Sequence, residues 1–208
     1  MRIDRNSIAV VLVGVVLLAL GPVLPSWAVS LLNVALCYGT VVLGMMLLMR
    51  TGIVSFGHGL YYCLGAYAAG LLDHFGKMPD MLLMVGAGAV TAGLVAAVLG
   101  LLLAKYRDIF FAMLSLAFSM ILYGLLVKTA SLGSTDGFNV AAKTVGGIVI
   151  AEDSVRIVVY SLAVVFATLS AFLLHQYLAS HQGRLAGAIK DNELRVEYMG
   201  ASVKAAVH

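Results

Sequence analysis

Long apolar segments recur along this chain and are separated by short polar or charged stretches. Six of them lie at about residues 8–24, 30–49, 51–75, 81–104, 109–127 and 155–178. A membrane-spanning helix needs about 20 apolar residues. Charged residues make up only 11% of the chain, against about 25% in a typical soluble domain. We therefore predict an all-α, polytopic membrane protein with about six spans.

Several classes of function are excluded by what the sequence lacks. The net charge of +3 is small and scattered, which gives no basis for a nucleic-acid partner. Cys37 and Cys63 have no paired Cys or His at metal-ligand spacing, so no metal site is predicted. Neither a phosphate-binding P-loop nor an H-E-x-x-H or G-x-S-x-G motif occurs. We expect no cofactor, no catalytic residue and no ATPase activity in this chain.

The distribution of Lys and Arg predicts the orientation in the membrane. If the N-terminus is cytoplasmic, nine of these residues lie inside and four lie outside, which agrees with the positive-inside rule. The count requires the third segment to cross the membrane rather than re-enter. The first segment also resembles a signal peptide, but an uncleaved first helix is the simpler interpretation because further spans follow at once.

The third segment, residues 51–75, begins irregularly. Three glycines fall within residues 52–59, and each weakens a helix by about 1 kcal/mol relative to Ala. Non-helical backbone at membrane depth survives where protein or a water-filled cavity satisfies it. We predict that this Gly-broken segment lines a translocation path through Ser55, Gly57, His58 and Tyr61. The competing interpretation, about equally supported, is that His58 meets lipid headgroups at the cytoplasmic interface.

Two further features have ordinary structural explanations. Gly88, Ala92, Ala96 and Gly100 form a ridge of small residues, for which helix packing within the bundle is favoured over a dimer face. The polar stretch at residues 128–153 includes the turn-forming cluster 133–137, which we interpret as an outer loop.

Residues 184–199, near the C-terminus, are predicted to form a short amphipathic helix. Leu185, Ile189, Val196 and Met199 share one face at helical spacing, opposite charged residues. Because its charges are mixed rather than basic, a groove on a protein partner fits this helix better than the bilayer surface.

Three segments together resemble the permeases of branched-chain amino-acid ABC importers of the LivM type. They are residues 52–58 (GIVSFGH) leading into 65–67 (GAY), residues 111–118 (FAMLSLAF), and residues 183–200, which contain GR at 183–184 and AIKDNE at 188–193. The last of these resembles the family's cytoplasmic coupling loop and is the most specific.

The resemblance implies a permease subunit in the bacterial inner membrane. Its expected partners are membrane lipid, a second permease subunit, cytoplasmic ABC ATPases and a periplasmic substrate-binding protein. ATP hydrolysis would take place in the separate ATPase subunits. The residues expected to couple to them are Arg184, Ala188, Ile189, Asp191, Glu193, Arg195 and Gly200.

This resemblance also implies a domain organisation and leaves alternatives open. We expect a permease bundle at 1–182, a coupling helix at 183–200 and, at 201–208, the start of a truncated next span, since family members continue beyond this point. An ABC permease for urea or short amides is one alternative function. A non-transporting membrane anchor for a cytoplasmic partner is another.

Overall fold

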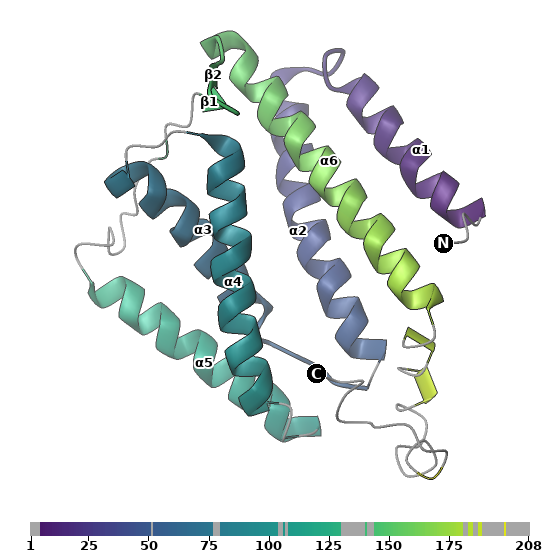
Figure 1. Ribbon diagram of the computed structural model, residues 1–208, viewed down its shortest axis with the longest axis vertical. Helices are drawn as coiled ribbons and strands as arrows, with labels where there is room; N and C mark the ends of the chain where they lie inside the picture. Colours follow the sequence, from purple (N-terminus) through teal and green to yellow (C-terminus); the bar gives the residue numbers. More distant parts are fainter. Residues whose placement is uncertain are drawn as a thin grey trace. The chain divides into compact units, whose positions relative to one another are not determined.

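A computed structural model describes most of the chain. The described residues are 5–50, 52–76, 80–103, 106, 108–129, 140, 144–180, 183–184, 187–188 and 198. Within them the named elements are α1 (Arg5–Leu20), α2 (Ser26–Arg50), α3 (His58–Gly76), α4 (Met81–Leu103), α5 (Asp108–Lys128), β1 (Thr144–Val145), β2 (Ile148–Val149) and α6 (Glu152–Ala179) (Figure 1).

The structure confirms a mainly helical chain with long apolar helices. Among the described residues, four helical segments are long and apolar enough to cross a membrane: Ser26–Arg50, Met81–Leu103, Ile109–Lys128 and Ser154–Ala179. Helix α1 is apolar but has 16 residues, fewer than a typical span needs. It stops at Leu20, before the predicted end of its segment, because Pro22 and Pro25 disfavour helix in the residues before them.

The chain divides into two compact units. Unit 1 contains Met1–Gly52 and Glu152–Val207, and unit 2 contains Ile53–Ala151 together with His208. Helices α1, α2 and α6 therefore belong to unit 1, and α3, α4, α5 and the β-hairpin belong to unit 2.

In unit 1, α1 and α2 each pack against α6. Val29, Tyr160 and Val164 form its buried core. The Tyr160 hydroxyl donates a hydrogen bond of 3.0 Å to the carbonyl of Leu17. Because Leu17 lies in the last turn of α1, that helix has no N–H group left to donate to its carbonyl. Tyr160 thus satisfies a backbone group that lipid could not.

The directions of the helices in unit 1 follow from their contacts. Gly14 lies against Thr168 and Gly21 lies against Tyr160, so α1 runs antiparallel to α6. Helix α2 runs parallel to α6, as the chain colours of Figure 1 show.

In unit 2, α3 and α4 pack closely through glycines. A Cβ atom added to Gly88 would lie 2.8 Å from the carbonyl oxygen of Gly65. The predicted ridge on α4 thus packs within the unit at Gly88 and Ala92, whereas Gly100 has open space at its Cβ position. Helix α5 makes lesser contacts with both α3 and α4.

A small β-hairpin lies beside the start of α4. Strands β1 and β2 pair antiparallel and are joined by Gly146 and Gly147, both with positive φ. One carboxylate oxygen of Asp80 accepts the N–H of Gly147 at 2.8 Å, and the other accepts that of Leu82 at 2.9 Å. Asp80 therefore caps α4 and ties the hairpin to it. The sequence interpretation of residues 128–153 as a loop missed this hairpin.

Candidate functional site

The residues between α2 and α3 form a non-helical connection with alternating burial. Gly52, whose φ is +81°, donates its N–H to the carbonyl of Met49 and ends α2. From Ile53 to Gly57 the backbone is not helical, and α3 begins at His58. Ile53, Ser55 and Gly57 are buried, whereas Val54 and Phe56 between them are exposed. The connection therefore presents one face to the interior of unit 2.

Two buried serine hydroxyls hold this connection in place. The Ser115 hydroxyl of α5 accepts the backbone N–H of Phe56 at 3.1 Å and donates to the carbonyl of Ala112 at 2.9 Å. The Ser55 hydroxyl accepts the N–H of Gly57 at 3.2 Å. These bonds give the backbone N–H groups of Phe56 and Gly57 side-chain acceptors in place of helical carbonyls.

Gly57 allows the connection to approach α5 closely. A Cβ atom at this position would lie 3.3 Å from the Cβ of Ser115 and 3.5 Å from the hydroxyl of Ser55. At Gly59, two residues later, nothing lies within 4 Å of that position. The space for a side chain is therefore closed at Gly57 and open at Gly59.

His58 and Tyr61 occupy the first turn of α3 and are half-buried. The Nδ1 atom of His58 lies 3.4 Å from the carbonyl oxygen of Ser55. If Nδ1 carries the proton in that contact, Nε2 is left as an acceptor. The first backbone N–H groups of α3 also carry the partial positive charge of a helix N-terminus. The start of α3 thus offers both a hydrogen-bond acceptor and a weakly positive end.

The four predicted path residues lie at the connection and in the first turn of α3, and Ser115 of α5 contacts the connection. Ser55, Gly57, His58 and Tyr61 fall within seven positions of the chain, and their role in transport stays a prediction. In the sequence, Ser115 is distinguished only by its place in the family-like segment at residues 111–118. The signal available was a serine hydroxyl in an apolar helix, which in a membrane usually has a hydrogen-bonding role, but Ser119 in the same helix carries the same signal.

The predicted coupling segment is described only in part. Gly183, Arg184, Gly187 and Ala188 have helical backbone, and Arg184 and Ala188 are exposed. Ile189, Asp191, Glu193, Arg195 and Gly200 lie outside the described residues.

Comparisons with known proteins identify the family. The model of the family described as "Branched-chain amino acid transport system / permease component" matches residues 27–207. No curated protein and no solved structure matches the chain. The match covers all of the described helices except α1, including the serine-held connection and the start of the coupling segment. The chain belongs to this family of transport permeases and is a multi-pass membrane protein.

Proposed function

We propose that this chain is the membrane-spanning permease subunit of an ATP-binding-cassette importer in the bacterial inner membrane, and forms part of a translocation path for branched-chain amino acids. The family match over residues 27–207 carries the proposal. The chain itself would not hydrolyse ATP. It would work with a second permease subunit, cytoplasmic ATPases and a periplasmic substrate-binding protein.

The directions of the helices in unit 1 support a bilayer topology of six crossings. Because α2 and α6 run parallel, the chain between them has to cross the membrane an odd number of times. Helices α4 and α5 supply two of these crossings, so α3 supplies the third. With α1 antiparallel to α6, the start of α1 and the end of α6 lie on one side. The Lys and Arg distribution makes that side the cytoplasm.

Cysteine accessibility tests this topology. Single cysteines replace Arg5, Lys143 or Lys190 in a chain whose Cys37 and Cys63 are changed to Ser. A membrane-impermeant thiol reagent applied from outside should label position 143 and leave positions 5 and 190 unlabelled. Labelling of all three positions from the same side would contradict the topology.

The serine-held connection at residues 53–57 supports the location of the path. Its backbone departs from helix directly before α3, and transporters often build substrate sites from such broken helices. We propose that Ser55 and Gly57 keep the connection open, while His58 and Tyr61 contact the passing substrate. The positive N-terminal end of α3 suits the carboxylate of an amino acid.

A matched pair of glycine variants tests the path. Gly57→Leu has no room beside Ser115, whereas Gly59→Leu places the same side chain in open space. In membranes that contain the assembled importer, Gly57→Leu should abolish uptake of labelled leucine, and Gly59→Leu should retain it. Wild-type uptake by Gly57→Leu, at equal amounts of protein in the membrane, would exclude this segment from the path.

We further propose that residues 184–199 dock on the ATPase. A helix this short is marginal alone in water, so its apolar face needs a groove. Ile189→Asp would place a carboxylate there, where an unpaired buried charge is costly. This variant should lose the ATPase on co-purification, whereas Lys190→Asp on the charged face should keep it. Retention at wild-type stoichiometry with Ile189→Asp would mean that this helix is not the docking site and would favour its lying on the membrane surface.

A further inference from the structure

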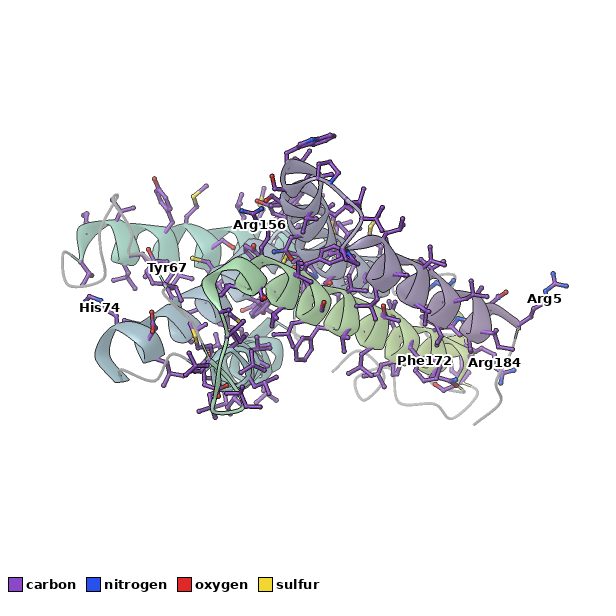
Figure 2. The ribbon with its side chains drawn as sticks, turned by 90° about the horizontal axis from the view of Figure 1, so that it is seen from above. Arg5, Tyr67, His74, Arg156, Phe172 and Arg184 are labelled. Carbon is purple, nitrogen blue, oxygen red and sulfur yellow. The ribbon has the colours of Figure 1, made fainter. Side chains whose placement is uncertain are left out.

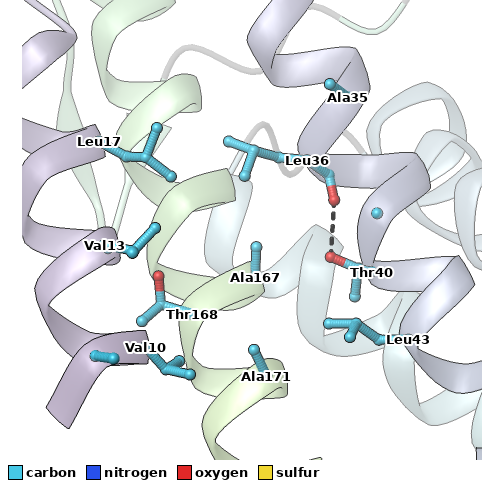
Figure 3. A pocket seen from close by; sticks show the side chains of 13 residues that line it. Val10, Val13, Leu17, Ala35, Leu36, Thr40, Leu43, Ala167, Thr168 and Ala171 are labelled. Carbon is cyan, nitrogen blue, oxygen red and sulfur yellow. Dashed lines mark hydrogen bonds between the residues drawn. The ribbon is translucent and has the colours of Figure 1, made fainter. Parts of the chain in front are cut away.

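A groove of about 500 Å³ runs between α1 and α2 in unit 1, with α6 as its floor (Figure 3). Its walls are apolar, and small residues such as Gly14 and Gly39 widen it. The floor is formed by Ala167, Thr168 and Ala171. Thr40, one of its two polar residues, donates its hydroxyl to the carbonyl of Leu36 at 2.9 Å, so that hydroxyl is already satisfied. The groove therefore suits a hydrocarbon occupant.

Three of the four described arginine residues of unit 1 lie at one end of this groove, and the fourth, Arg156, lies near the start of α6 at the other end. Arg5 begins α1 and Arg50 ends α2. Since α2 is parallel and α1 antiparallel to α6, both arginines lie at the end where α6 finishes. Arg184 continues from that end, and its N–H donates to the carbonyl of Ser180. Figure 2 shows Arg5 and Arg184 together at the same end as Phe172.

The charge at this end is unbalanced within the described part of unit 1. Its acidic residues, Glu152 and Asp153, stand at the start of α6, which is the opposite end. Arg5, Arg50 and Arg184 are all exposed. An apolar groove that leads to exposed arginines is complementary to an amphiphile with an anionic headgroup.

The dimensions of the groove fit a lipid chain. On α1 the groove extends from Ala9 to Leu17, about 12 Å of helix, and Ala9 lies about 6 Å of helix beyond Arg5. On α2 it reaches Leu43, about 10 Å before Arg50. One leaflet contributes about 15 Å of hydrocarbon. An acyl chain whose headgroup meets the arginines would therefore extend well into the groove.

We propose that unit 1 binds an anionic glycerophospholipid of the cytoplasmic leaflet, with an acyl chain between α1 and α2 and the phosphate at Arg5 and Arg50. The proposal requires the membrane location that the family assigns. It does not depend on the substrate or on the ATPase, so its test can fail without affecting the proposed function.

The experiment is native mass spectrometry of the purified 208-residue chain in detergent, with equal amounts of phosphatidylglycerol and phosphatidylcholine that carry identical acyl chains. We expect about tenfold more bound phosphatidylglycerol. Arg5→Gln combined with Arg50→Gln should bring the ratio close to one. Arg156→Gln, near the opposite end of α6, should leave the ratio unchanged.

A second pair of variants tests the groove itself. Gly39→Leu should fill it and remove both lipids. Gly93→Leu on α4 is the matched control, because nothing lies within 4 Å of the added Cβ at either glycine. Equal binding of the two lipids by the wild-type chain, or lipid retention by Gly39→Leu, would overturn the proposal. The proposal would also be overturned if the wild-type chain were a lipid-free dimer and the Gly39→Leu variant were a monomer. That result would show that a second copy of the chain occupies the groove.

Discussion

Units 1 and 2 are each built around three apolar helices, yet they bring those helices together in different ways. In unit 2, α3 and α4 meet at backbone level, since Gly88 lies directly against the carbonyl of Gly65. In unit 1, side chains fill the contacts, as Gly14 meets Thr168 and Gly21 meets the ring of Tyr160. Within the described residues, α1 and α2 do not contact each other. A side chain added at a glycine that faces backbone therefore meets atoms that cannot move away. A side chain added at a glycine that faces another side chain meets a neighbour that can shift.

The largest expected effect is at the backbone contact of unit 2. Gly88→Leu would force a side chain against the Gly65 carbonyl, 2.8 Å from the new Cβ, with no flexible neighbour to move away. We expect a loss of at least about 3 kcal/mol in the free energy of unfolding. Thermal unfolding in detergent measures it, with Gly93→Leu as the control. Equal stability of the two variants would show that α3 and α4 do not pack as described.

A smaller loss is expected from removing the hydroxyl that holds the connection before α3. Ser115→Ala leaves the part-buried N–H of Phe56 without its acceptor, which should cost about 2 kcal/mol. Ser119→Ala is the control, since its hydroxyl donates only to a helical carbonyl, that of Ser115. Similar melting temperatures for the two variants would contradict the structural role of Ser115.

The corresponding glycine of unit 1 should behave differently because its neighbour is a side chain. Gly14→Ala would place a Cβ 2.5 Å from the hydroxyl oxygen of Thr168, and we expect a loss of about 1 kcal/mol. The double variant Gly14→Ala/Thr168→Ala should recover most of it. A double-mutant cycle measures the coupling. Additive losses would mean that the two residues are not in contact.

The sequence predicted the helices well because their signal is local. Apolar segments of about 20 residues are sufficient to indicate spans. The three glycines at residues 52–59 indicated the non-helical backbone between α2 and α3. It could not predict which glycines meet backbone, since Gly86, Gly88 and Gly93 look alike in α4. That distinction depends on how neighbouring helices are rotated. It also missed the β-hairpin, although Gly146–Gly147 between β-branched residues is a typical hairpin signal.

The smallest expected effect concerns Asp80, which links α4 to the hairpin. The N–H of Gly147, and to a lesser extent that of Leu82, holds the pKa of this carboxyl below its ordinary value. A carboxyl whose pKa is lowered by folding stabilises the fold above its ordinary pKa, and this contribution is lost as the pH falls through the lowered value. The hairpin should therefore stay attached at neutral pH and loosen only in acid.

Asp80→Asn separates the two roles of this side chain at neutral pH. The Asn oxygen can still cap α4 by accepting the N–H of Leu82, but its NH₂ group cannot accept the N–H of Gly147. Hydrogen exchange should thus become faster in residues 144–149, while the first turn of α4 keeps its protection. In acid, the wild-type hairpin should approach the exchange of the variant, because a protonated carboxyl also gives up one acceptor. Faster exchange in α4 as well would mean that the cap and the hairpin open together as one cooperative unit, and that Asp80 does not have two separable roles.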